Sequence, residues 1–313
     1  METILPSLFI ERLQTIIPKE YWDPVLKTFT EQPMISIRVN VLKTDKEKVI
    51  YSLRKQNIRV KEVAWYHDAL ILSGVSKKEL GETALVQNGF IFIQSLSSML
   101  VPLILDPKPG DHILDMCAAP GSKATQIAAM MHNQGSLLAL ESVKERYFKL
   151  KSVISLLGAD VIQAKLTDAR RFSRGVNLFD RILVDAPCSS EGRFRTDDEK
   201  SFAYWSPQKI KEMAYKQKEL LLSASRLLKS GGLLIYSTCT FAPEENEAVM
   251  DWFLQKTENN FRVMKPENFP ILAYRPVEQW NNNTYDPQIK NCLRVLPHEA
   301  MEGFFIAKLM RMG

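Results

Sequence analysis

The sequence predicts an α/β fold, in which a parallel β-sheet carries helices on both faces and follows a small α+β domain. Three observations predict it. From Asp111 onward, short apolar runs alternate with stretches of helical period. Glycine-containing turns separate several of these segments. Residues 1–94 lack this rhythm. We therefore expect a small N-terminal α+β domain over residues 1–94 and a larger sheet domain over residues 95–313.

The small domain combines helical and strand-like patterns in an irregular order. Residues 35–42 alternate in a way that is typical of a strand, and residues 45–56 have the period of a helix. Two shorter helical patterns precede them. Residues 89–96 are expected to lead the chain into the larger sheet.

The larger domain is predicted element by element from its apolar runs and its turn residues. Its expected strands are residues 112–116, 136–141, 161–164, 181–185, 233–236 and 303–309. Its expected helices are residues 120–131, 144–157, 207–228 and 244–255. In open sheets of this kind the ligand lies beyond the carboxyl ends of the strands, where the winding reverses. The turns after Met116, Glu141, Asp185 and Ser237 should therefore surround one crevice.

Composition excludes several classes of protein and leaves others open. The chain has 313 residues, of which 45% are hydrophobic, so it can bury a sizeable core. We expect no signal peptide, because no small-residue cleavage site follows the opening apolar run, and no membrane span. The four cysteines include no C-x-x-C pair, so we expect free thiols in the cytoplasm and neither a metal site nor disulfides. A net charge of +5 permits a nucleic-acid partner without requiring one.

The positive charge is concentrated between residues 142 and 181. This segment holds nine Lys or Arg residues against four acidic ones. The simplest explanation is a solvated helix face, and the alternative is a surface that faces RNA phosphates. The basic residues are Lys144, Arg146, Lys149, Lys151, Lys165, Arg170, Arg171, Arg174 and Arg181.

A turn of small residues between the first strand and the first helix of the larger domain is a candidate cofactor site. Small residues let backbone amides approach a ligand closely. The turn lacks both the G-x-G-x-x-G and the P-loop spacing, which disfavours dinucleotides and nucleoside triphosphates. Glu141 ends the second strand, where a carboxylate can hold a ribose diol, and Asp168 could accept from an adenine amino group. Together they indicate a nucleoside ligand such as S-adenosylmethionine. The turn comprises Cys117, Ala118, Ala119, Pro120, Gly121, Ser122 and Lys123.

Two cysteines follow predicted neighbouring strands, Cys188 in DAPCSS and Cys239 in STCT. A single cysteine is usually a small buried hydrophobe, but two at adjacent strand ends should open toward the same crevice. Methylation of carbon 5 of a pyrimidine would use both. A thiolate that adds to carbon 6 makes carbon 5 nucleophilic, and a second group assists release. The spacing leaves open which cysteine attacks.

These motifs closely resemble the Nol/Nop/Sun family of RNA 5-cytosine methyltransferases, and within it the bacterial RsmF type that modifies 16S ribosomal RNA. The resemblance covers nearly the whole chain, and the paired cysteines are highly specific to this family. The matching motifs are SIRVNVLK (36–43), IQSLSSML (93–100), DMCAAPGSK (115–123), DAPCSSEG (185–192), WSP (205–207), GGLLIYSTCT (231–240), EENE (244–247) and EGFFIAKL (302–309).

The resemblance implies a Rossmann-like S-adenosylmethionine-dependent methyltransferase sheet and a role for each site residue. Cys239 is implied as the nucleophile and Cys188 as the residue that helps release the product. Asp185 is implied to lie near the target base and the methionine end of the cofactor. The turn at residues 117–123 is implied to bind S-adenosylmethionine together with Glu141, Arg146, Asp168 and Asp185. Two residues of the small domain, Arg38 and Asn40, are expected near the RNA.

The chain departs from the family pattern in two places. Ser122 stands where many members have glycine, which should be tolerated because serine is small. The chain ends at Gly313, whereas RsmF-type enzymes commonly continue into a further RNA-binding region, and compact members include tRNA methyltransferases. The resemblance implies 16S rRNA as the substrate, and this departure makes tRNA the alternative.

Functions outside RNA methylation also remain open at this level. A non-catalytic RNA-binding assembly factor could use the same scaffold, and other methyltransferases act on small molecules or proteins. The paired thiols and the acids disfavour both. We expect a cytoplasmic protein that partners RNA without a metal, with a monomer as the default. Three aromatic residues could stack on RNA bases or pack in the core: Phe194, Tyr204 and Trp205.

Overall fold

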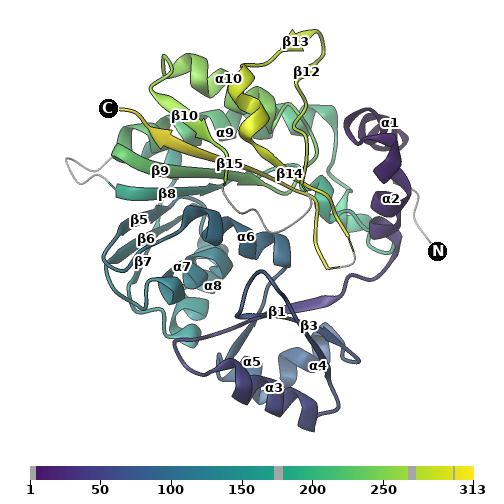
Figure 1. Ribbon diagram of the computed structural model, residues 1–313, viewed down its shortest axis with the longest axis vertical. Helices are drawn as coiled ribbons and strands as arrows, with labels where there is room; N and C mark the ends of the chain where they lie inside the picture. Colours follow the sequence, from purple (N-terminus) through teal and green to yellow (C-terminus); the bar gives the residue numbers. More distant parts are fainter. Residues whose placement is uncertain (1–4, 173–178, 267–272, 299) are drawn as a thin grey trace.

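The computed structural model describes residues 5–172, 179–266, 273–298 and 300–313 (Figure 1). Within these residues the main sheet has nine strands in the order β11-β14-β15-β9-β8-β5-β6-β7, with β10 also paired to β15. Five of its strands are β5 (His112–Asp115), β6 (Ser136–Glu141), β7 (Ile162–Leu166), β8 (Phe179–Asp185) and β9 (Leu228–Thr238). The other four are β10 (Phe261–Met264), β11 (Ala273–Tyr274), β14 (Leu293–Val295) and β15 (Phe304–Arg311).

The five strands from β5 to β9 form the parallel part of the sheet, as the alternation of apolar runs and helices predicts. β5 pairs with both β6 and β8, so the winding reverses between β5 and β8. A crevice at such a reversal point lies beyond the carboxyl ends of the strands. β15 then pairs antiparallel with β9, and β10 and β14 pair antiparallel with β15. The sheet is therefore mixed, and the predicted strand at residues 303–309 runs antiparallel to its neighbour β9.

Helices cover both faces of the sheet, as Figure 1 shows. Neighbouring strand residues point to opposite faces, so Ile113 packs with the α6 and α7 side, while Leu114 packs with the α9 and α10 side. These helices and α8 are α6 (Leu96–Leu105), α7 (Ser122–Met130), α8 (Lys144–Leu157), α9 (Pro207–Leu227) and α10 (Glu247–Lys256). Short 3₁₀ helices lie at η2 (Ala169–Arg171), η3 (Glu191–Arg193), η4 (Glu199–Ser201) and η5 (Pro287–Asn291), and a hairpin at β12 (Gln279–Trp280) and β13 (Asn283–Thr284).

A second sheet of four strands forms in the N-terminal part, in the order β2-β3-β1-β4. All of its pairings are antiparallel. Its strands are β1 (Ile35–Val39), β2 (Arg59–Glu62), β3 (Ala69–Ser73) and β4 (Ile91–Ile93), and its helices are α3 (Lys46–Lys55), α4 (Lys77–Glu82) and α5 (Ala84–Gln87). The predicted helix at residues 45–56 is confirmed, with Asp45 as its cap through a hydrogen bond from the Lys48 amide.

The first helices of the chain lie away from this small sheet. Figure 1 shows α1 (Ser7–Ile16) and α2 (Trp22–Thr30), both purple, beside the C-terminal part of the molecule; η1 (Lys19–Tyr21) joins them. Phe9 and Phe29 pack in one cluster with Phe194 and Phe241. The first 30 residues therefore contribute to the packing around the larger sheet.

Three details of the sequence-based prediction are wrong. Residues 91–93 are β4 of the small sheet and pair with β1, instead of leading into the large sheet. The helix expected from residue 244 begins at Glu247, because the side chains of Glu245 and Asn246 bond to the cysteine turns (see below). α6 was not predicted, since its nearly continuous apolar sequence shows no amphipathic period.

Candidate active site

The predicted site residues meet in a cavity of about 510 Å³ at the carboxyl ends of the parallel strands. It is lined by the turns that follow β5, β6, β7, β8 and β9, as the switch-point rule predicts. Every residue of the predicted site lines it except Gly121. Those residues are Cys117, Ala118, Ala119, Pro120, Ser122, Lys123, Glu141, Arg146, Asp168, Asp185, Cys188 and Cys239.

The turn after β5 owes its shape to short-range contacts. The buried Asp115 carboxylate accepts a hydrogen bond from the Cys117 amide at 3.2 Å. Gly121 has a φ of +112°, and a Cβ there would lie 3.1 Å from Leu150 and from Val153 of α8. A residue with a side chain would therefore be strained and crowded at this position. The turn thus packs closely against α8 and presents its backbone to the cavity.

Glu141, the last residue of β6, is held in the orientation that a diol-binding carboxylate needs. It is buried, and its Oε1 accepts from the amides of Ser142 at 2.8 Å and Val143 at 2.9 Å. Its Oε2 lies 3.5 Å from Nε of Arg146, whose Nη2 donates to the Ala119 carbonyl at 2.8 Å. Arg146 therefore connects the two parts of the candidate cofactor site.

Asp168 and Asp185 both line the cavity and have different partners. Asp168 forms a forked ion pair with Arg170, whose Nη2 is 2.6 Å from Asp168 Oδ2, and this bond holds the pKa of Asp168 below its usual range. Asp185 accepts from Nζ of Lys123 at 2.7 Å and from the Ser237 hydroxyl at 2.8 Å. Asp185 therefore joins the ends of β8 and β9 to α7.

The two cysteine thiols lie side by side, with their sulfurs 3.4 Å apart. The hydrogen bond from Cys188 lowers the pKa of Cys239 to about 7, and the charge of Arg193 acts in the same direction. The same bond and burial raise the pKa of Cys188 well above its ordinary value. Cys239 is therefore the thiol that ionises first and Cys188 the one that keeps its proton.

A third thiol in the cavity has a different character. Burial raises the pKa of Cys117 well above its ordinary value, and Asp115 adds to the effect. Cys292 is likewise buried, inside the core. These two thiols have the properties of small apolar side chains.

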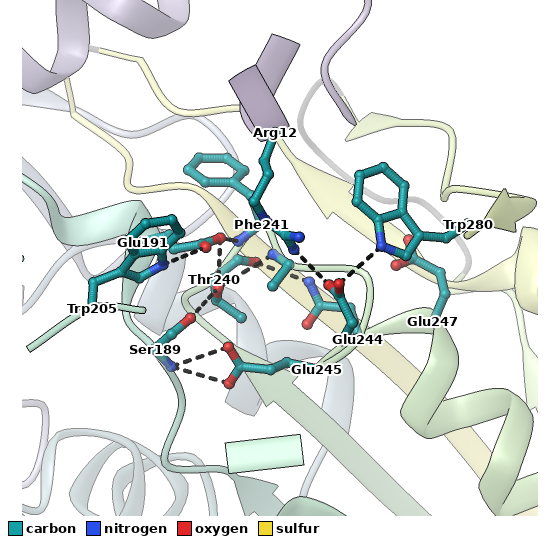
Figure 2. Close-up of polar contacts among 12 residues, drawn as sticks. Arg12, Ser189, Glu191, Trp205, Thr240, Phe241, Glu244, Glu245, Glu247 and Trp280 are labelled. Carbon is teal, nitrogen blue, oxygen red and sulfur yellow. Dashed lines mark hydrogen bonds and ion pairs between the residues drawn. The ribbon is translucent and has the colours of Figure 1, made fainter. Parts of the chain in front are cut away.

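Buried carboxylates hold the two cysteine turns together (Figure 2). Glu191 accepts from the Thr240 hydroxyl at 2.9 Å, the Phe241 amide at 3.0 Å and Nε1 of Trp205 at 2.8 Å. On the other side, Glu245 accepts from the Ser189 amide at 3.0 Å. Each carboxylate thus comes from one cysteine turn and bonds to the other.

The acidic motif after Cys239 anchors this region to the rest of the molecule. Glu244 accepts from Arg12 of α1 at 2.7 Å and from Nε1 of Trp280 at 3.0 Å (Figure 2). Glu247 is fully buried and forms a two-pronged ion pair with Arg294, each prong being 2.6 Å long. The contacts place the cysteine turn between α1 and β14.

The sequence interpretation missed several residues at the site. Arg193, Ser190, Asp115 and Phe304 line the same cavity. Burial and the nearby charge of Asp185 raise the pKa of Asp115 to about 7. Asp115 could have been found, because it is the acidic residue near the end of the predicted strand at residues 112–116, just before the small-residue turn. Nothing in the local sequence around Phe304 indicates its place in the cavity.

Three aromatic residues were expected either to stack on RNA or to pack in the core, and Arg38 was expected near RNA. Phe194 is 1% exposed and packs against Phe9, and Trp205 bonds to Glu191, so both belong to the core, whereas Tyr204 is 87% exposed. Arg38 is buried, with its guanidinium bonded to Gln94 and Thr125. Arg38 is therefore a packing residue between the small sheet and α7.

RNA contact was also considered for Asn40 and for the basic segment at residues 142–181. The Asn40 amide donates to the carbonyls of Gly89 and Leu157, both at 2.8 Å, so it too joins the small sheet to α8 instead of facing RNA. Lys144, Lys149 and Lys151 are exposed on α8, which fits either explanation of the basic segment. Arg174 lies outside the described residues.

None of the helices in the described part of the chain combines the length and the apolar character that crossing a bilayer requires. The same residues hold no group of three or more His, Cys, Asp or Glu side chains arranged for a metal ion.

Comparisons with known proteins identify the family. Residues 102–310 match the family model of the 16S rRNA methyltransferase RsmB/F, and residues 5–77 match that of the RsmF/B-like ferredoxin-like domain. A Pyrococcus abyssi tRNA (cytosine(49)-C(5))-methyltransferase is 37% identical over 94% of this chain and 92% of its own length.

Two further comparisons agree with this match. Ribosomal RNA small subunit methyltransferase F of Escherichia coli is 35% identical over 98% of this chain, which spans 63% of that relative. The crystal structure of PH0851 has a TM-score of 0.85 and 32% identity, and covers 97% of this chain and 65% of its own. The chain therefore belongs to the RsmB/F methyltransferase family.

Proposed function

We propose that this protein is an S-adenosylmethionine-dependent RNA (cytosine-5) methyltransferase that works through a covalent bond between Cys239 and its target cytosine. One observation carries the proposal: two thiols lie 3.4 Å apart at one end of a cavity whose other end is built for a nucleoside. Methylation of other targets has no use for such a pair. The family membership and the RNA cytosine methyltransferases among its relatives support the same reaction.

The residues after β5 and β6 fit S-adenosylmethionine. Glu141 keeps Oε2 free of backbone bonds, so this oxygen can accept from a ribose hydroxyl. Asp168 lies in the same cavity for the adenine amino group, and the turn at residues 117–123 approaches without bulky side chains. Arg146 holds the Ala119 carbonyl and so fixes the turn. When bound, the cofactor supplies an electrophilic methyl group on a sulfonium.

Cys239 is assigned as the nucleophile and Cys188 as the residue that aids release. The Cys239 thiolate adds to carbon 6 of cytosine and forms a carbon–sulfur bond, while the electron pair of the 5,6 double bond moves to carbon 5. Carbon 5 takes the methyl group and the sulfonium sulfur keeps the electrons of the broken bond. Carbon 5 then loses its proton to a base, the 5,6 double bond forms again, and Cys239 leaves as a thiolate. Asp185 can hold the amino edge of the base.

A larger groove of about 1070 Å³ adjoins the catalytic cavity and is the proposed path of the RNA strand. Ser98, Pro120, Ser122 and Arg193 line both spaces. Three lysines on its wall offer positive charge to phosphates. They are Lys27, Lys77 and Lys149. The target base must leave its stack to reach the thiols, which favours a loop or an opened helix.

We assign the protein to the cytoplasm and, by default, treat it as a monomer.

The preferred RNA is 16S rRNA, because the family model that matches residues 102–310 carries that description. The second candidate is tRNA. The relative that favours it is 37% identical and matches this chain over 92% of its own length. Both targets place the methyl group on carbon 5 of cytosine.

The test is to incubate the purified protein with labelled S-adenosylmethionine and with 16S rRNA and total tRNA in separate reactions, and then to map 5-methylcytosine by bisulfite sequencing. We expect label at a single cytosine in one of the two RNAs. Label in tRNA alone would select the second candidate. No label in either RNA, with naked rRNA and assembled small subunits both tried, would contradict the proposed activity.

A further inference from the structure

We propose that Arg193 is the positioning residue that makes Cys239, rather than Cys188, the attacking thiolate. The inference rests on the proposed function. The two cysteines occupy equivalent places, each in the turn after one of two neighbouring parallel strands. Their sulfurs are in contact, so either could take the role of nucleophile by position alone. An asymmetric charge near the pair is needed to decide between them.

The backbone of η3 is fixed directly against Cys239. The Gly192 amide donates to the Cys239 carbonyl at 2.9 Å. A Cβ at Gly192 would lie 3.0 Å from that carbonyl oxygen and 2.4 Å from the carbonyl oxygen of Gly303, so only glycine allows this approach. Glu191, on the other side of Gly192, bonds to Thr240 and Phe241. Arg193 is thus held in place by the same turn that carries Cys239.

The Arg193 side chain lines the cavity that contains both thiols, where Nε of Arg193 lies 3.2 Å from Oε2 of Glu302. Glu302 precedes β15 and holds the guanidinium at the edge of the cavity. Arg193 also lines the adjoining groove. An RNA strand in that groove would cover the guanidinium and reduce its contact with water.

The charges around the two sulfurs differ. Cys239 faces the Cys188 thiol and the Ser190 hydroxyl from the turn after β8, the positive Arg193 from η3, and the negative Glu302. Cys188 faces Cys239 and Glu245, and Arg193 interacts more strongly with Cys239 than with Cys188. Burial raises the pKa of Glu245 to about 8, so this side chain carries little charge near pH 7. The positive charge of Arg193 is therefore the asymmetry that favours ionisation of Cys239. Asp185, which also influences Arg193, is itself paired with Lys123.

The size of the effect is limited by solvent, since the Arg193 side chain is 51% exposed. Water screens the field of an exposed charge, so we expect the lower part of the range that neighbouring charges produce, about one pH unit. Loss of the Arg193 charge should therefore leave roughly tenfold less Cys239 thiolate at any pH below the ionisation midpoint of Cys239.

The test measures the reactivity of each cysteine without RNA or methyl transfer. The full-length protein is kept reduced and treated briefly with iodoacetamide from pH 6 to pH 10, and peptide mass spectrometry counts alkylation at Cys239, Cys188 and Cys117 separately. The wild-type protein should react first at Cys239, with a midpoint near pH 7. Arg193→Gln should raise that midpoint by about one pH unit and narrow the preference for Cys239 over Cys188.

Two matched variants separate charge from packing. Arg193→Lys keeps the charge and should keep the wild-type midpoint and preference. Arg262→Gln removes an exposed arginine on β10, remote from the thiols, and should change neither. Arg193→Met is the second neutral variant if Arg193→Gln loses its cooperative melting transition.

Two results would overturn the inference. The first is an unchanged alkylation midpoint of Cys239 and an unchanged preference for Cys239 over Cys188 in the neutral variants. The second is a shift of the midpoint in Arg193→Lys as large as that in Arg193→Gln, which would indicate an effect of packing. Because alkylation requires no substrate, a protein that failed to methylate RNA would still give a clear answer. Normal methylation with an unchanged alkylation profile would reject the role of Arg193 and leave the proposed function standing.

Discussion

The two ends of the active-site cavity are built in different ways. At the cofactor end, the key carboxylates bond to amides one or two residues away, as Glu141 does to Ser142 and Val143 and Asp115 does to Cys117. At the thiol end, the bonds join distant parts of the chain. Glu191 meets Thr240 across 49 residues. The carboxylates of Glu141 and Asp115 are therefore held by local bonds, whereas those of the thiol end are held only in the complete fold.

This difference has a consequence for mutations. Changes to exposed side chains at the cofactor end, such as Arg146, should alter ligand binding with little effect on stability. Changes to the buried carboxylates at the thiol end should alter both chemistry and stability, since these carboxylates position the cysteines and also hold distant segments together.

The largest expected effect is the loss of the nucleophile. Cys239→Ala should reduce methyl transfer by on the order of 10⁴-fold or more, the scale of nucleophile removal in other enzymes. Cys239 is 7% exposed, and alanine fits the space, so the melting temperature should change little. Single-turnover transfer of labelled methyl groups to RNA measures the rate. Cys292→Ala, in the core, is the matched control and should retain transfer; a Cys239→Ala rate within tenfold of wild type would contradict the assignment.

The next effect concerns the buried ion pair behind the thiol end. Arg294→Met leaves the Glu247 carboxylate buried without its partner and should cost about 3–5 kcal/mol in the free energy of unfolding. Urea denaturation followed by circular dichroism measures it. Lys48→Met, which breaks an exposed pair with Asp45, is the control and should leave the midpoint unchanged. Equal stability of Arg294→Met and wild type would show that the thiol end does not depend on this pair.

A smaller effect is a pH dependence of stability that arises from Glu245. Burial raises its pKa to about 8, compared with 4.5 for the ordinary side chain, which we take for the unfolded chain. The folded state therefore binds more protons between about pH 4.5 and pH 8, and its stability should fall as pH rises through that window. Glu245→Gln should remove this contribution, which is at most about 1.4 kcal/mol per pH unit. Urea titrations at several pH values test it, and an unchanged slope would contradict the raised pKa.

The smallest effect is expected at the cofactor end. Arg146 is 52% exposed, and its Nε lies 3.5 Å from Glu141. Arg146→Ala should weaken binding of S-adenosylmethionine by roughly threefold and leave stability within about 1 kcal/mol of wild type. Isothermal titration calorimetry measures the affinity, with Lys144→Ala on the same helix as the control. A loss of stability as large as that of Arg294→Met would erase the contrast between the two ends.

The same contrast explains what could be predicted from sequence. The cofactor turn and Glu141 were identified because a small-residue turn and an acid at a strand end are local patterns. A parallel sheet with its strand-end turns around one crevice followed from the alternation of elements. Arg193 and the pairing of Glu191 with Thr240 were not predicted, because they depend on which distant turns meet in the fold.

Other misses have the same cause. Phe194 and Arg38 are residue types that are common at RNA surfaces, and their burial is decided by α1 and α7, which local sequence does not place. The division at residues 94 and 95 stays a prediction. It falls between β4 and α6, yet α1 packs beside Phe194 and Phe241.

The most direct test of the covalent mechanism is the fate of RNA in the two cysteine variants. Each variant is incubated with S-adenosylmethionine and its substrate RNA, and adducts are separated by denaturing electrophoresis and mapped by mass spectrometry. Cys188→Ala should accumulate a covalent adduct between Cys239 and carbon 6 of the methylated cytosine, while Cys239→Ala should form none. An adduct in Cys239→Ala, attached through Cys188, would contradict the account.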